Sequence, residues 1–139
     1  MKFVLITGAS TGIGEACATY LAKQGWQVFA GVRKQADAKR LAKISKNITA
    51  IILDVTKPKQ IVQAMTRISK KAGKKGLQGL VNNAGVAITG PLEFLPIAEL
   101  RQQHAINFLG QGEVTQAALP LLRAGKGRVV NMSSISGKV

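Results

Sequence analysis

The chain has 139 residues and a mass of 14.7 kDa, with 46% hydrophobic residues, 19% charged residues and a mean hydropathy of +0.13. This length is enough for one hydrophobic core, and the composition excludes a disordered or collagen-like chain. Lys and Arg number 20 against 6 Asp and Glu, giving a net charge of +14. Such a charge favours anionic partners, but it does not choose among nucleic acid, an anionic membrane and a nucleotide cofactor.

Short apolar runs alternate with amphipathic helical patterns along the whole chain. We predict strands at residues 3–6, 26–32, 48–53, 77–81 and 128–132, and helices at 12–24, 37–45, 58–71 and 97–123. Because parallel strands need long crossover connections, this order predicts one α/β domain over residues 1–139, a doubly wound parallel sheet with helices on both faces. In such sheets a ligand binds beyond the carboxyl ends of the strands. The residues that follow each strand are therefore the candidates for a functional site.

A glycine-rich segment joins the first predicted strand to the first predicted helix. Glycines let the chain turn sharply and let the start of the helix approach a diphosphate, whose charge is held by backbone N–H groups and the helix dipole. Between the first strand and first helix of a βαβ unit this signal is strong, and the segment lacks the Lys-Ser/Thr ending of a phosphate-transfer loop, so ATP hydrolysis is not implied. The cofactor-binding candidates from this segment are Thr7, Gly8, Ser10, Thr11, Gly12, Ile13 and Gly14.

The pattern T-G-x-x-x-G-I-G in this segment resembles the cofactor loop of the short-chain dehydrogenase/reductase family, and three further stretches are similar to that family. Leu53-Asp54-Val55-Thr56 resembles the segment after the third strand, Asn82-Asn83-Ala84-Gly85 the segment after the fourth, and Asn131-Met132-Ser133-Ser134-Ile135-Ser136-Gly137 the end of the fifth. Together the four motifs cover the whole chain in the family's order.

The resemblance implies a Rossmann-type NAD(P)-binding fold and an enzyme that interconverts an alcohol and a carbonyl by hydride transfer. It implies catalytic roles for Ser134, which begins an S-x-x-G pattern, and for Asn107, where the family has an Asn that kinks the long helix and orders a water. In the family, the Asp after the third strand accepts a hydrogen bond from the adenine amino group, which carries over to Asp54. The further cofactor-binding candidates that it implies are Val55, Asn82, Ala84 and Gly85.

The end of the second predicted strand favours NADP(H) over NAD(H). At this place a dinucleotide-binding fold uses an acidic residue for the ribose 2′-hydroxyl of NAD and a cation for the 2′-phosphate of NADP. Here Arg33 and Lys34 follow the strand, and no acidic residue occurs before Asp37. We therefore predict that Arg33 and Lys34 contact the cofactor, with Ser10 as a helper.

The catalytic Tyr and Lys that the resemblance implies are not among these 139 residues. The family places them about a dozen residues after the Ser, beyond Val139, and the one Tyr of the chain, Tyr20, falls in the first helix. We expect that these residues are a truncated or frameshifted version of a longer reductase, interrupted after the fifth strand, and that they are inactive alone. Residues 128–132 would then form an uncovered apolar edge of the sheet. The alternatives are a non-catalytic dinucleotide-binding module and a basic nucleic-acid binder.

The remaining features indicate few other partners. The cluster Lys70, Lys71, Lys74 and Lys75 is typical of a solvated helix end, and 4% aromatic residues argue against a nucleic-acid partner. No apolar stretch approaches the ~20 residues of a membrane span, so we expect no membrane partner and a cytoplasmic location. One His and one Cys provide no protein-only zinc site, and we expect no metal. The resemblance implies that a full-length form could assemble into homo-oligomers through the long helix.

Overall fold

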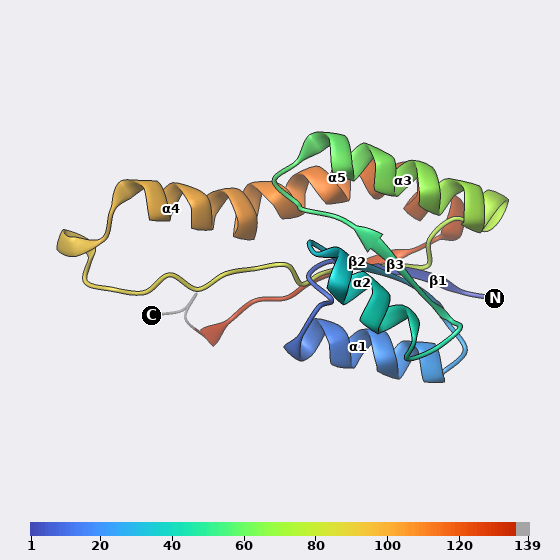
Figure 1. Ribbon diagram of the computed structural model, residues 1–139. Coiled ribbons are helices and arrows are strands. Elements are labelled where there is room, and N and C mark those ends of the chain that lie inside the picture. Colours follow the sequence, from blue (N-terminus) through green and yellow to red (C-terminus); the bar gives the residue numbers. More distant parts are fainter. Residues whose placement is uncertain (136–139) are drawn as a thin grey trace.

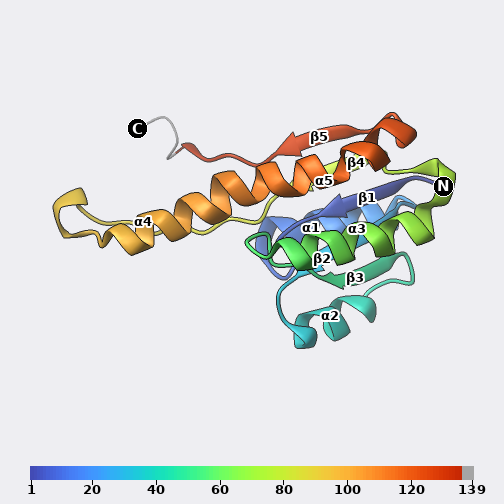
Figure 2. The same ribbon diagram turned by 90° about the horizontal axis from the view of Figure 1, so that it is seen from above.

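Five parallel strands form one sheet in the computed structural model, which describes residues 1–135. The strands are β1 (Phe3–Ile6), β2 (Gln27–Val32), β3 (Ile48–Ile52), β4 (Gly79–Asn82) and β5 (Arg128–Asn131), in the order β3-β2-β1-β4-β5. Neighbouring strands pair in parallel throughout. Seen from above, β3 and β5 lie at the two edges of the sheet (Figure 2). The predicted doubly wound parallel α/β fold is confirmed.

Helices cover both faces of this sheet (Figure 1). On one face lie α1 (Gly12–Lys23) and α2 (Gln35–Ala42), and on the other lie α3 (Pro58–Ala72) and α5 (Gly110–Gly125). The short helix α4 (Ile97–His104) continues through a π-helical turn (Ala105–Leu109) into α5 and projects beyond the sheet in both views. Two 3-10 turns, at Gly73–Lys75 and Leu92–Phe94, complete the elements of the described residues.

Strand β1 lies at the centre of two hydrophobic clusters. Successive side chains of a strand point to opposite faces, so Phe3 and Leu5 pack with α3 and α5 while Val4 and Ile6 pack with α1 and α2. All four side chains are buried. This explains why β1 reads as a continuous apolar run rather than an alternating one.

The largest differences between the predicted and the observed boundaries concern two helices. Helix α2 begins at Gln35 and ends at Ala42, because Lys34 is already the extended residue that precedes the first turn. The single helix predicted at 97–123 is interrupted by the π-helical turn and runs on to Gly125. Both differences concern where a helix begins or is distorted, which periodicity alone does not define.

Strand β5 is an exposed edge, as the sequence predicted. All four of its residues are exposed, and Val129 and Val130 keep 39% and 50% of their surface open to solvent. In the described part of the chain β5 pairs with β4 alone.

None of the helices within residues 1–135 combines the length and apolarity that a membrane span requires. The same residues contain no group of three or more His, Cys, Asp or Glu side chains placed to hold a metal ion.

The central position of β1 predicts a large loss of stability for Leu5→Ala. Leu5 is fully buried, so the truncation leaves a cavity and should lower the free energy of unfolding by about 2–5 kcal/mol in urea denaturation. Leu92→Ala makes the same change at a side chain that is 74% exposed and should alter stability by less than about 0.5 kcal/mol. Equal losses for the two variants would contradict this assignment of the core.

Candidate functional site

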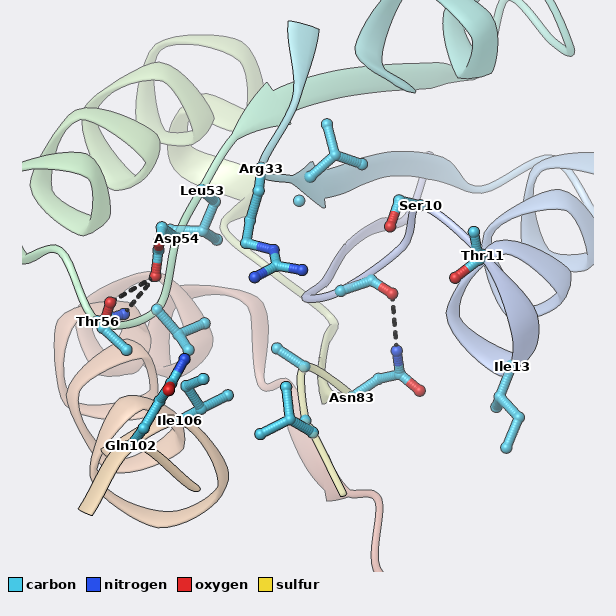
Figure 3. A pocket seen from close by; sticks show the side chains of 17 residues that line it. Ser10, Thr11, Ile13, Arg33, Leu53, Asp54, Thr56, Asn83, Gln102 and Ile106 are labelled. Carbon is cyan, nitrogen blue, oxygen red and sulfur yellow. Dashed lines mark hydrogen bonds between the residues drawn. The ribbon is translucent and has the colours of Figure 1, made fainter. Parts of the chain in front are cut away.

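The loop after β1 is fastened to the end of β4 by side-chain hydrogen bonds. The Thr7 hydroxyl accepts hydrogen bonds from the backbone amides of Asn83 and Ala84, at 3.0 and 2.9 Å. The Asn83 side-chain amide donates to the carbonyl oxygens of Thr7 and Gly8, at 3.0 Å each, and the bond to Gly8 is drawn in Figure 3. The carboxyl ends of two neighbouring strands are thus held as one unit, at the edge of the sheet where the sequence places the ligand.

Two glycines determine how α1 starts against this loop. Gly12 is the first residue of the helix and has a φ of +59°, a conformation that most L side chains disfavour. At Gly14 a Cβ atom would overlap the Gly8 carbonyl oxygen and the Asn83 side chain, so only glycine allows this close approach. Among the described residues the Thr11 side chain finds no backbone amide of α1 to cap. Because the first amides of a helix have no acceptor within the helix, this end of α1 is suited to an anion.

A cavity of about 410 Å³ opens beside the loop, where the ends of β1, β2, β3 and β4 converge. Figure 3 shows the Arg33 side chain extending from the end of β2 toward the centre of this cavity, between Asp54 and Ser10. The structure therefore brings together candidates from four separate stretches of sequence. Those that line this first cavity are Gly8, Ser10, Thr11, Ile13, Arg33, Asp54, Val55, Ala84 and Gly85.

Five predicted cofactor residues lie outside the lining of this cavity. Thr7 is buried and holds the loop, Gly12 and Gly14 form the start of α1 behind it, and Lys34 is exposed at the start of α2. The Asn82 side chain is buried on the face of the sheet that α5 covers, and its neighbour Asn83 takes the position that faces the loop.

The side chain of Asn82 has a bracing role instead. Its amide nitrogen donates to the Thr115 hydroxyl on α5 and to the side-chain oxygen of Asn131 on β5, at 2.8 Å each. The side chain of Asn82 therefore braces β4 against α5 and β5, and its contact with the cofactor stays a prediction.

The sequence missed several residues of the first cavity. Asn83 could have been chosen, since it follows Asn82 in the same motif, and Thr56 could have been chosen because it lies two residues after Asp54. Gln102 and Ile106 carry no local signal, because they reach the cavity only through the placement of α4. The others are Gly31, Val32, Leu53 and Val86.

Asp54 is held in its ionised form. Burial by itself would raise the pKa of this carboxyl group, but the hydroxyl and backbone amide of Thr56, with the charges of Arg33 and Lys57, outweigh burial and keep the pKa below its ordinary value. Both Thr56 groups donate to the same Asp54 oxygen, Oδ1, at 2.7 and 2.9 Å (Figure 3). The second carboxylate oxygen can accept a hydrogen bond from a ligand in the cavity.

A second cavity, of about 1020 Å³, adjoins the first and contains both predicted catalytic residues. The two cavities share Ile13 and the segment 83–86, and the second is also lined by Asn107 and Ser134. The other half of the S-x-x-G pattern, Gly137, lies outside the described residues.

Asn107 lies within the π-helical turn and ties it to the segment after β4. Its side-chain oxygen accepts a hydrogen bond from the Val86 amide at 2.9 Å, and its side-chain nitrogen donates to the Val86 carbonyl at 2.8 Å. One turn earlier, Gln103 accepts a hydrogen bond from the Ile88 amide at 2.7 Å. The helix distortion expected at Asn107 is therefore present, and π-helical turns are frequent at functional sites.

The environment of Asp54 predicts the effect of Thr56→Val. This variant removes the hydroxyl donor but keeps the backbone donor, so the pKa of Asp54 should rise toward the ordinary value of about 3.9 in an NMR titration of the carboxyl group. Because the folded pKa is depressed, Asp54 stabilises the fold above the unfolded pKa, and that contribution is lost as pH falls through the folded pKa. The variant should therefore lose less stability than the parent between pH 7 and acidic pH. Thr66→Val, which removes an exposed hydroxyl on α3, should leave the pKa of Asp54 unchanged.

Comparison with known proteins gives the same family throughout. The family of short chain dehydrogenases matches residues 2–139. The chain is 46% identical over 144 residues to estradiol 17-beta-dehydrogenase 2 of Mus musculus, which covers 99% of this chain and 37% of that protein. It is 43% identical to the NADPH-dependent 3-dehydrocapnine reductase of Ornithobacterium rhinotracheale and 41% identical to retinol dehydrogenase 16 of Mus musculus, over 50% and 44% of those proteins and 99% of this chain.

A solved structure agrees with these relatives. The crystal structure of a short-chain dehydrogenase from Streptomyces avermitilis superposes with a TM-score of 0.90 at 33% identity, covering 99% of this chain and 51% of the other. The chain thus spans half or less of the length of these relatives. Motif, topology and overall similarity agree, and the chain belongs to the short-chain dehydrogenase family.

Proposed function

We propose that this chain binds NADP(H) in the first cavity and carries part of the catalytic group of an oxidoreductase that interconverts an alcohol and a carbonyl. The observation that carries the proposal is the continuity of the two cavities, which connects the glycine loop and Arg33 to Asn107 and Ser134. A dinucleotide is long enough to need such a pair of adjoining spaces, one for its adenosine end and one for its nicotinamide end.

The residues of the first cavity fit the parts of a dinucleotide. The first amides of α1, behind Thr11, provide donors for a diphosphate, and the ionised Asp54 provides an acceptor for the adenine amino group. Arg33 provides a cation at the end of β2 that suits a 2′-phosphate. A similar chain being a reductase named as NADPH-dependent supports this choice of cofactor.

The second cavity fits the reacting end. When bound, the nicotinamide ring supplies or accepts the hydride. Ser134 would orient the oxygen of a small alcohol or carbonyl substrate by hydrogen bonding, and Asn107 would keep segment 83–86 in place against the cofactor. The Tyr and Lys that would transfer the proton are not among the 139 residues, and Tyr20 is 63% exposed on α1. We therefore expect these residues alone to bind the cofactor without turnover. The cytoplasmic location stays a prediction.

The proposed diphosphate site predicts different outcomes for two substitutions at Gly12. A Cβ atom there meets no other atom within 4 Å, and Asn and Asp tolerate a positive φ better than other residues. Gly12→Asp should weaken NADPH binding at least about tenfold in titration calorimetry, because it adds a negative charge where the phosphate charge would lie. Gly12→Asn, which has the same shape without the charge, should bind substantially more tightly than Gly12→Asp. Equal affinities for both variants and the parent would refute the proposed site.

The proposed role of Arg33 predicts a change in cofactor preference. Arg33→Gln removes a charge-assisted contact to the 2′-phosphate, so NADPH binding should weaken about 10- to 100-fold while NADH binding changes little. The matched control is Lys34→Gln, which removes the adjacent charge from a side chain outside the cavity and should have a smaller effect. A parallel loss of NADH and NADPH binding in Arg33→Gln would argue against this role.

A further inference from the structure

Arg40 of α2 contacts the glycine loop and the first turn of α1 at the same time. Its guanidinium pairs with both oxygens of the Glu15 carboxylate, Nη1 with Oε1 at 2.6 Å and Nη2 with Oε2 at 3.0 Å. The same Nη2 also donates to the backbone carbonyl oxygen of Ser10. One side chain therefore connects three parts of the chain that lie 25 and 30 residues apart.

The bond to Ser10 determines the orientation of a peptide at the edge of the first cavity. In a trans peptide the C=O of one residue and the N–H of the next point in opposite directions. Within residues 1–135, the lining of the first cavity includes Ser10 and Thr11 but not Arg40. Because the Ser10 carbonyl is held by Arg40, we expect the Thr11 N–H, on the opposite side of this peptide, to face the cavity.

This bond completes a pattern in the loop. The carbonyl oxygens of Thr7 and Gly8 are bound by the Asn83 side chain, and that of Ser10 is bound by Arg40. Carbonyl oxygens carry the negative end of the peptide dipole and would repel a phosphate. A loop whose carbonyls are engaged by side-chain donors can present its N–H groups to an anion.

The pairing with Glu15 removes a competing charge. Glu15 lies in the first turn of α1, where a carboxylate is attracted by the same positive helix end that would attract a phosphate. The hydrogen bond from Arg40 lowers the pKa of Glu15, and its carboxylate carries a full negative charge at neutral pH. Without Arg40, that carboxylate would stand uncompensated beside the proposed diphosphate site.

We propose that Arg40 is a positioning residue for the cofactor diphosphate. It does not touch the diphosphate; it orients the Ser10–Thr11 peptide and neutralises the charge of Glu15. This rests on the proposed dinucleotide-binding function. It differs from the role of Arg33, which lines the cavity and would contact the 2′-phosphate itself.

The test measures the affinity of NADPH, NADH and adenosine for the parent chain and for Arg40→Gln, Glu15→Gln and the double variant. Arg40→Gln should weaken NADPH and NADH equally, by about tenfold or more, and leave adenosine unchanged because adenosine has no phosphate. Glu15→Gln should bind both dinucleotides at least as tightly as the parent. The double variant should recover part of the loss, since the unpaired carboxylate is gone while the Ser10 bond is still missing. Lys39→Gln, which removes a neighbouring charge of α2, is the matched control.

The outcomes separate this role from two others. Exposed ion pairs contribute little to stability, so the thermal unfolding midpoint of Arg40→Gln should stay close to that of the parent, and a parallel loss of adenosine binding would show a merely structural role. A loss confined to NADPH would show direct contact with the 2′-phosphate. Unchanged affinity in Arg40→Gln would also overturn the proposal, and a double variant no tighter than Arg40→Gln would overturn the part assigned to Glu15. A parent chain that binds neither dinucleotide would refute the proposed function, and the role of Arg40 with it.

Discussion

The polar groups at the carboxyl ends of β1 and β4 must be satisfied where the chain leaves the sheet, and one pair of side chains does this. Thr7 accepts two backbone amides through its hydroxyl, while Asn83 donates to two backbone carbonyls. Unpaired backbone groups at such a place would each cost free energy comparable to a lost hydrogen bond. Because these bonds fix the glycine loop against the segment after β4, the first cavity, the start of α1 and the approach of Gly14 all depend on them.

The first cavity combines a cation and a carboxylate within a strongly cationic chain. A net charge of +14 attracts any anion at long range, and surface lysines do not distinguish one anion from another. In the first cavity, however, Arg33 lies near Asp54, whose low pKa keeps it ionised. A ligand that pairs with both side chains offers an anionic group and a hydrogen-bond donor, as the proposed dinucleotide does.

The sequence predicted the sheet and most of the first cavity because both depend on local signals. The apolar run of β1 indicates a buried strand, and the glycines after it indicate a close approach between backbone segments. The residues that follow parallel strands lie at the same edge of the sheet. Asn82 and Asn83 show the limit: both belong to one motif, and only the register of β4 decides that the first points into the sheet and the second toward the loop. The positions of Arg40 and Gln102 could not be predicted from the sequence, because they depend on where α2 and α4 pack.

The π-helical turn links the two cavities in a way that a regular helix would not. Two side chains bind the segment after β4: Asn107 binds Val86, and Gln103 binds Ile88. The first two residues are one helical turn apart, and their partners are two residues apart. That segment forms a wall common to both cavities, so the distortion at Asn107 fixes the boundary between them. A residue that holds a wall common to both cavities can influence the shape of both. For this reason we interpret Asn107 as part of the frame of both cavities rather than as an isolated catalytic group.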